Sequence, residues 1–256
     1  MSKLSSLKYL VPTPARSWLR QKGLVQRGRL FFDHVTDWSV LRRVQPYRGH
    51  LGVTHGHCVD RFYIEEFLQV HRGLITGDVA EFADDAYTRR FGSGDIRSHV
   101  LDIDSSNPNV TLILDLAQTE VAPSDLFDCI LATQVLFEIY DYAACVRSLL
   151  KMLRPGGVAL ITVPGISPIL PNNMRGKGQD WWRFTASSAQ RVVADVFGEA
   201  NVEVQSYGNV LAAVAFLHGL VQEELTAEEL AYHDPNYEVI IGIKATKPAI
   251  NQELNR

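Results

Sequence analysis

The stretch from Asp125 to Pro164 constrains the fold of this chain more than any other, because it predicts a strand, a helix and a second strand in succession. Phe127–Thr133 is a short apolar run typical of a strand buried on both faces. From Asp141, a predicted N-cap, apolar side chains recur at helical spacing until Arg154-Pro155-Gly156-Gly157 ends the helix. Val158–Val163 is the second apolar strand. Two buried strands joined by a crossover helix are parallel, so the pattern predicts an α/β fold.

Three further strands are predicted upstream, each ending in an acidic residue. We expect them at Gly77–Phe82, His99–Asp104 and Thr111–Asp115, with the acids Glu81, Asp104 and Asp115 at their ends. Ligands of open parallel sheets bind beyond the carboxyl ends of the strands, where a carboxylate can accept both ribose hydroxyls of an adenosine ligand. A strand-end acid also commonly caps the following turn. The sequence leaves both interpretations open.

The strand, helix and strand contained in FDCILATQVLFEIYD and LRPGGVALITVPG resemble the fourth strand, the following helix and the fifth strand of class I S-adenosylmethionine-dependent methyltransferases. ADDAYTRRFG, VLDIDSSNPNVTLILDL, DWWRFT and YHDPNYEVIIGIKATKP extend the resemblance from about Leu41 to Pro248. Over that length the chain is similar to a bacterial subfamily associated with glycosyltransferase and surface-glycan genes. The resemblance implies a Rossmann-like fold. Its seven-stranded, mostly parallel sheet carries helices on both faces, and its last strand is antiparallel beside the fifth.

Other elements fit around this core. A surface helix is predicted over Val59–His71, a helix capped by Thr185 follows the fifth strand, and Val202–Ser206 is a sixth strand. Val210–Leu225 reads as one long apolar helix, and Tyr237–Thr246 as the last strand.

The resemblance also implies a cofactor, S-adenosylmethionine, and residues to bind it. Glu81, with Ala83 and Asp84 in the loop after it, is expected at the methionine end, Asp104 at the ribose, Asp115 and Leu116 at the adenine, and Thr133 and Gln134 along the methionine side. One departure concerns the loop, where Ala83-Asp84-Asp85-Ala86 replaces the usual glycines. A dinucleotide is disfavoured more strongly, because no Gly-x-Gly-x-x-Gly motif is present and the two aspartates would repel a diphosphate.

The acceptor side is less defined. The loop over residues 164–178 is long enough to form a lid or a wall of the acceptor site. Asp180, Trp181 and Arg183 are candidates for binding a sugar or an aromatic acceptor. In the alternative interpretation, the tryptophans pack under the loop and Arg183 pairs with Asp180. The catalytic base stays unassigned among His218, His233 and Asp180.

The leading hypothesis is therefore a methyltransferase acting on a small-molecule or glycan acceptor. The alternative is a non-catalytic protein of the same fold that serves as a binding partner or scaffold in surface-glycan biosynthesis. A nicotinamide-dependent oxidoreductase is the least favoured. Nucleic acid is not an expected partner, because the main domain is acidic.

Charge divides the chain into a basic leader and an acidic body. Residues 1–48 hold ten Lys or Arg against two Asp, a net charge of +8, and the remainder carries −12. We predict a leader over 1–48 with short helices at Ser17–Val35 and Trp38–Val44, a methyltransferase-like domain over 49–248, and a tail over 249–256. The leader is expected either to contact a membrane or acidic partner, or to dock on its own acidic domain.

Compartment and metal content follow from composition. The three cysteines, Cys58, Cys129 and Cys145, are widely spaced, and no apolar run reaches the ~18 residues of a membrane span. Since no secretory signal is evident either, we expect a cytoplasmic protein. His55, His57 and Cys58 suggest zinc, but no fourth ligand is apparent, so no metal is expected.

Overall fold

The computed structural model describes residues 25–26, 29–30, 43–49, 55–170 and 179–249. The chain divides into two compact units, Met1–Val44 and Gln45–Arg256. In the first unit, β1 (Val25–Gln26) and β2 (Arg29–Leu30) pair as antiparallel strands. The helix predicted over Ser17–Val35 is therefore wrong at these residues, where Gly28 lowers helix propensity. The rest of that prediction, and most of the helix predicted over Trp38–Val44, lies outside the described residues.

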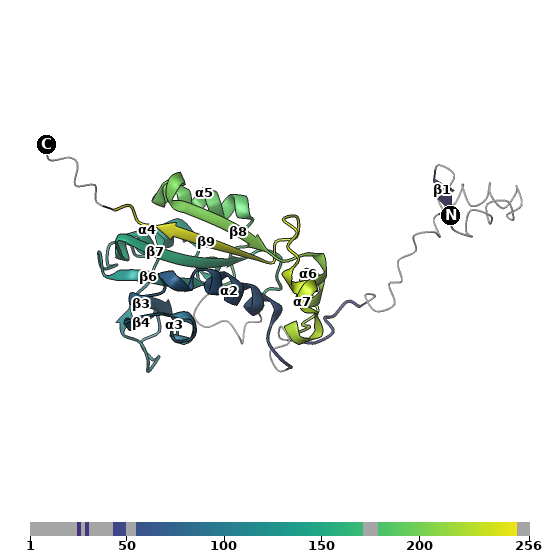
Figure 1. Cartoon of the computed structure of the whole chain (residues 1–256), viewed down its shortest axis with the longest axis horizontal. Helices are drawn as coiled ribbons and strands as arrows, with labels where there is room; N and C mark the ends of the chain where they lie inside the picture. Colours follow the sequence, from purple (N-terminus) through teal and green to yellow (C-terminus); the bar gives the residue numbers. More distant parts are fainter. Residues whose placement is uncertain (1–24, 27–28, 31–42, 50–54, 171–178, 250–256) are drawn as a thin grey trace, which may run out of the picture. The chain divides into compact units, whose positions relative to one another are not determined.

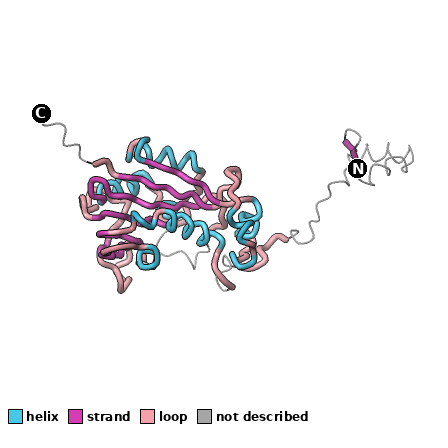
Figure 2. The backbone as a smooth tube through the Cα atoms, viewed as in Figure 1, coloured by secondary structure: helices cyan, strands magenta, loops and turns pink. Residues whose placement is uncertain are grey.

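The second unit is built on a seven-stranded sheet in the order β5-β4-β3-β6-β7-β9-β8, whose strands run side by side in Figure 2. In the chain the strands are β3 (Gly77–Phe82), β4 (Ile96–Asp102), β5 (Leu112–Ile113), β6 (Phe127–Thr133), β7 (Leu153–Pro164), β8 (Val202–Tyr207) and β9 (Ile240–Thr246). The first five pair in parallel, whereas β9 is antiparallel to both β7 and β8. This strand order and the antiparallel last strand confirm the predicted fold class.

Helices cover both faces of the sheet. They are α2 (Val59–Val70), which crosses one face in Figure 1, α3 (Ala86–Phe91), α4 (Tyr142–Met152), α5 (Ala186–Phe197), α6 (Val210–Leu217) and α7 (Ala227–Ala231). Short 3-10 turns are η4 (Arg72–Leu74), η5 (Leu136–Glu138), η7 (Glu199–Asn201) and η8 (Gln222–Glu224). Along β7, Ala159 and Ile161 join the core under α4 and α5, while Leu160 joins the core under α2 and α6. Alternating side chains of one strand thus build both cores.

The central strand, helix and strand form as predicted, with one shifted boundary. Asp141 caps α4 by accepting a hydrogen bond from the Ala144 N–H at 2.8 Å. The helix ends at Met152, and β7 begins at once with Leu153, which pairs with Phe127. The segment Arg154-Pro155-Gly156-Gly157 was predicted to separate the helix from the strand. In the structure, Pro155-Gly156-Gly157 instead lies inside β7. Gly156 adopts φ +81° there, which an irregular start to the strand requires.

The predicted second and third strands are displaced. β4 ends at Asp102, so Asp104 lies two residues beyond the strand, and β5 is held only by the pairs Leu101–Leu112 and Asp102–Ile113. The described segments after β4 and β5 contain no helix before β6. The predicted helix over Val210–Leu225 is also too long, because α6 ends at Leu217 and Gly219 turns the chain at φ +69°.

A cluster of charges at the amino ends of β3 and β4 gives a first prediction. Arg97 binds the buried Asp78 carboxylate through Nε at 2.7 Å and Nη2 at 2.6 Å. These hydrogen bonds, with those from His99 and Arg154, hold the pKa of Asp78 well below its ordinary value. Because the folded-state pKa is depressed, the stabilisation is complete above about pH 4 and is lost as the pH falls further.

We expect Asp78→Asn to lower the free energy of unfolding at pH 7 by about 2 kcal/mol. Below pH 4 the gap between the variant and the wild type should narrow, and urea unfolding at several pH values measures both. Asp125→Asn is the control. The Asp125 side chain is half-exposed and pairs with Lys247, so this substitution should lower the free energy of unfolding by less than about 1 kcal/mol. A gap that does not change with pH would contradict this account.

Candidate active site

Two cavities lie at the carboxyl ends of the parallel strands and share a wall. The first, of about 520 Å³, extends from β3 and β6 to α2 and the segment after β7. The second, of about 540 Å³, lies over the ends of β4, β5 and β6. The shared lining residues are Phe82, Ala83, Thr133, Gln134 and Glu138. Each volume is in the range of small-molecule sites.

Ala83 keeps a glycine-like backbone in the loop where glycines are missing. Its φ is +69°, in the left-handed region that is unfavourable for residues with a Cβ. The loop is held in place by its neighbours. The Ala83 N–H donates to the Leu101 carbonyl at 2.9 Å, and the Asn107 side chain donates to the Ala83 carbonyl at 2.7 Å. The loop therefore forms a tight turn beside both cavities without its glycines.

This conformation predicts that Ala83→Gly stabilises the protein by about 1 kcal/mol, since glycine removes the left-handed strain but adds unfolded-state entropy. The melting temperature should rise by about 2 to 4 °C. Ala143→Gly in α4 is the matched control and should destabilise by about 1 kcal/mol, because its backbone is helical. A lower melting temperature for Ala83→Gly would show that the turn is not strained.

Glu81 anchors the helix that follows this turn. Its carboxylate is 2% exposed and accepts hydrogen bonds from the backbone N–H groups of Tyr87 at 3.1 Å and Thr88 at 2.7 Å. Burial raises the pKa of Glu81. The residue lines the first cavity and also fixes the start of α3. Both interpretations of a strand-end acid thus apply to it, and Asp84 lines the same cavity as an exposed residue.

The second cavity is lined by three aspartates, of which one was not predicted. Asp102, at the end of β4, accepts hydrogen bonds from the Asp104 N–H at 2.9 Å and from the Asn107 side chain at 2.7 Å, so both of its oxygens hold the loop. Asp104 accepts from the Ser106 N–H and hydroxyl through one oxygen. Asp115 accepts from the Ala117 N–H and the Gln118 side chain. Apolar walls complete the cavity: Leu101, Ile103, Leu114, Leu116, Val135 and Ile139.

Gln134 stands where the two cavities meet and has an unusual backbone. It follows β6 with φ +56°, and its N–H and side-chain amide both bond to Thr162, at 2.9 Å to the carbonyl and 3.3 Å to the hydroxyl. A non-glycine residue in this region is strained, and such strain is concentrated at functional sites. Thr133 and Gln134 thus lie together at the junction.

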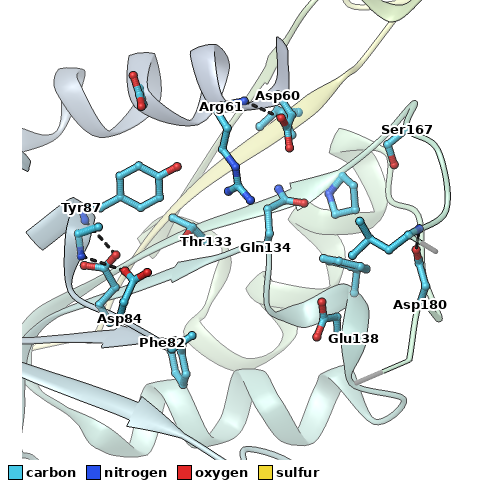
Figure 3. Close-up of a pocket in the computed structure, with 18 of the residues that line it drawn as sticks. Asp60, Arg61, Phe82, Asp84, Tyr87, Thr133, Gln134, Glu138, Ser167 and Asp180 are labelled. Carbon is cyan, nitrogen blue, oxygen red and sulfur yellow. Dashed lines mark hydrogen bonds between the residues drawn. The ribbon is translucent and has the colours of Figure 1, made fainter. Parts of the chain in front are cut away.

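Residues of α2 form a wall of the first cavity that the sequence analysis missed. Asp60 and Arg61, at the start of this helix, line the cavity, and the Arg61 guanidinium extends toward Gln134 in Figure 3. Arg61 interacts electrostatically with Asp60 and with Tyr87, and both raise the pKa of its guanidinium. A surface helix was predicted over Val59–His71, yet Asp60 within it is only 8% exposed. The sequence did hold one indication of this role, since Asp60 is a charged residue in the first turn of the predicted helix.

Of the predicted acceptor residues, two reach the cavity and one does not. Asp180 and Arg183 line the first cavity and form an ion pair with each other. Asp180 also accepts from the Leu170 N–H at 2.9 Å, and Arg183 donates to the Pro168 carbonyl at 2.8 Å. The pair therefore fastens the chain after β7. Trp181 lines neither cavity; it is 50% exposed and packs edge-on against Tyr140.

The two histidines considered as bases lie elsewhere. His233 contacts Glu66 at 3.3 Å and packs between the rings of Tyr63 and Tyr207, and His218 forms the C-cap of α6. Neither is among the described residues that line the two cavities. The prediction of the base therefore retains only Asp180, whose carboxylate is already paired.

Neither a metal site nor a membrane span is found among the described residues. The described residues contain no group of His, Cys, Asp and Glu able to hold a metal ion. His57 instead pairs with Glu223 at 2.5 Å, and Cys58 is buried. Among the helices in the described ranges, none has the length and apolar content to cross a membrane.

The chain is similar to a known protein family. Residues 76–199 match the model of a family described as a methyltransferase domain. A comparison with curated protein sequences gave no match.

The similar solved structures include several methyltransferases, each at low sequence identity. One is an S-adenosylmethionine-dependent methyltransferase from Mesorhizobium loti (15% identity, TM-score 0.48, 74% of this chain and 100% of that one). The N-methyltransferase NodS from Bradyrhizobium japonicum, in complex with S-adenosylhomocysteine, has 14% identity and a TM-score of 0.46 over 76% of this chain and 90% of its own. Phosphoethanolamine N-methyltransferase 2 from Haemonchus contortus has 14% identity and a TM-score of 0.48, over 72% of this chain and 52% of its own.

Proposed function

The chain contains a class I S-adenosylmethionine-dependent methyltransferase domain, and from this premise we propose that it transfers the methyl group of S-adenosylmethionine to a small-molecule or glycan acceptor. The observation that carries the proposal is the pair of joined cavities at the carboxyl ends of the strands. The second would hold the adenosine part of the cofactor, and the first would hold its amino-acid part and leave room for an acceptor. When bound, the cofactor supplies an electrophilic methyl group on a positively charged sulfur.

The residues of the second cavity fit the adenosine part. Asp104 would accept hydrogen bonds from the ribose hydroxyls, because it lines the second cavity just beyond the end of β4. Asp115 and Leu116 would line the adenine edge, within the apolar walls that an aromatic base requires. The turn at Ala83 brings backbone close to the cavity without a side chain larger than methyl.

The first cavity fits the methionine part at its inner end. Arg61 would bind the carboxylate, since its guanidinium lines the cavity and points toward Gln134 (Figure 3). Glu81, Ala83 and Asp84 would lie near the ammonium, and Thr133 and Gln134 beside the methionine chain. The acidic lining suits a donor that carries both a sulfonium and an ammonium group.

The acceptor would occupy the rest of the first cavity, toward Asp180, Arg183 and the segment after β7. Positioning of donor and acceptor at attack distance can supply roughly 7 to 11 kcal/mol of the barrier to such a transfer. A glycan acceptor, a role in surface-glycan biosynthesis, a cytoplasmic location and contact of the basic leader with a membrane or an acidic partner are parts of this proposal. They rest on the sequence resemblance and on the charge of residues 1–48.

A non-catalytic binding protein of this fold is the second candidate. The missing glycines favour it, because the backbone of the cofactor loop is strained at Ala83. The two candidates differ in whether the cofactor binds.

Titration calorimetry with S-adenosylhomocysteine tests the proposal on the full chain. We expect binding with a Kd on the order of micromolar, and no binding of NAD⁺ as the control nucleotide. Absence of heat with S-adenosylhomocysteine at high protein concentration would refute the enzyme assignment and favour the non-catalytic candidate.

A further inference from the structure

The first cavity carries more negative charge than its arginines balance. Six carboxylates and three guanidinium groups line it. Two of the arginines are already paired with carboxylates of the same lining, Arg90 with Glu65 and Arg183 with Asp180. The third, Arg61, interacts with the charge of Asp60 and with Tyr87, so the three arginines balance three of the six carboxylates. A ligand that fills this cavity therefore meets a negative field.

Asp60 is a buried carboxylate without a full set of partners. It is only 8% exposed, and one of its oxygens accepts from the Arg61 N–H at 2.8 Å. The only other hydrogen bond to this carboxylate comes from the backbone N–H of Asp60 itself, so no side chain among the described residues donates to it. Burial raises the pKa of Asp60, because water no longer stabilises the charge. A ligand that brings a positive charge and N–H donors would offset this cost.

Glu138 is the second carboxylate of this kind, and its position is informative. It is half-buried in η5, and its side chain has no hydrogen bond or ion pair with the described residues. It is also the charged member of the set that lines both cavities. Burial raises the pKa of Glu138, with the nearby Asp180 adding to the effect. Glu138 therefore lies in the wall that the two cavities share, and Figure 3 shows it beside the first cavity.

We propose that the methyl acceptor is an amine, which binds as an ammonium ion to the Asp60 and Glu138 carboxylates in the first cavity. The inference rests on the proposed function and adds the chemical class of its acceptor. The aromatic side chains of the same lining, Phe82, Tyr87, Phe137 and Phe216, provide an apolar surface for the body of the amine.

The chemistry requires a proton acceptor where Glu138 lies. An ammonium ion has no free electron pair, so it must first give one proton to a carboxylate. The nitrogen pair then forms the N–C bond, while the C–S bond breaks and its electron pair stays on sulfur. The product is an N-methylated ammonium ion and a neutral thioether, and Glu138 returns its proton to solvent.

Three probes with the same ring and chain length test the inference: 2-phenylethylamine, 2-phenylethanol and phenylacetate. Their binding is measured by calorimetry on the full chain saturated with S-adenosylhomocysteine. We expect the amine to bind about tenfold more tightly than the alcohol, because an ion-paired hydrogen bond is worth that much. Phenylacetate should bind most weakly. Equal binding of the amine and the alcohol, or preference for phenylacetate, would overturn the inference.

Substitutions of the two carboxylates test whether they cause the tighter binding of the amine. Asp60→Asn and Glu138→Gln should each weaken binding of the amine about tenfold and leave binding of the alcohol unchanged. Glu228→Gln, an exposed carboxylate outside both cavities, is the control and should change neither. If the variants retain the wild-type preference, the assignment of these carboxylates is wrong.

Binding of S-adenosylhomocysteine separates this inference from the proposed function. Asp60→Asn, which lies outside the second cavity, must bind it with near wild-type affinity, which also shows that this variant is folded. If the wild type does not bind it, the proposed function fails. If the wild type binds it but shows no preference for the amine, only the present inference fails.

Discussion

Replacing Asp104 by asparagine is expected to weaken binding of S-adenosylhomocysteine by about 100-fold, the cost of two charge-assisted hydrogen bonds to a ribose diol. Asp104 lines the second cavity, and its carboxylate is oriented by the Ser106 N–H and hydroxyl, at 2.9 and 2.8 Å. Asparagine keeps the shape and the acceptor oxygen for Ser106, but it loses the negative charge. The loss should therefore appear in affinity, and calorimetry measures it.

The controls for this prediction separate ligand binding from loop structure. Ser106→Ala removes the groups that orient the carboxylate and should weaken binding by less than about tenfold. Asp234 is a matched residue far along the chain, since its carboxylate accepts from the Asn236 N–H two positions on, as Asp104 does from Ser106. Asp234→Asn should leave affinity unchanged. Unaltered affinity of Asp104→Asn would exclude Asp104 as the ribose ligand.

The largest effect on stability is expected at Phe67 of α2. This side chain is 1% exposed and lies against Gly242 of β9, where an added Cβ would come within 2.5 Å of the phenylalanine ring. Close packing of a ring on a glycine leaves a cavity when the ring is removed, and the neighbouring sheet cannot collapse to fill it. Phe67→Ala should lower the free energy of unfolding by about 3 to 5 kcal/mol, measured by urea denaturation.

The same substitution should also affect the site, because α2 carries Asp60 and Arg61. Binding of S-adenosylhomocysteine is expected to weaken as the helix loses its anchor. Val70→Ala is the control on the same helix, since Val70 is 71% exposed, and it should change stability by less than about 0.5 kcal/mol. A loss of less than about 1 kcal/mol for Phe67→Ala would show that α2 does not depend on this contact.

The sequence was sufficient for the central part of the fold and for most strand-end residues. Phe127–Thr133 and Asp141 are found as predicted, because a buried strand and a capped amphipathic helix leave strong local patterns. Boundaries set by pairing with a neighbour were wrong. β4 ends at Asp102 because its partner β5 is only two residues long, a fact that depends on contacts across the sheet.

Some residues of the site were predicted from the sequence and others were not. Glu81, Asp104 and Asp115 line the two cavities and also hold the turns that follow them, so the two interpretations of a strand-end acid were not exclusive. Asp60, Arg61 and Glu138 were missed, because their role depends on where α2 and η5 lie relative to β6. Trp181 stays a prediction: its backbone N–H bonds to the Phe137 carbonyl, and its ring packs against Tyr140 outside both cavities.

The central claim is that one cofactor spans both cavities, and a crystal structure of the full chain soaked with S-adenosylhomocysteine tests it most directly. The account predicts adenosine density over the ends of β4 and β5, with the ribose at Asp104, and the amino-acid part in the first cavity beside Arg61. Density for adenine in the first cavity, or well-ordered crystals with no ligand density at either place, would contradict it.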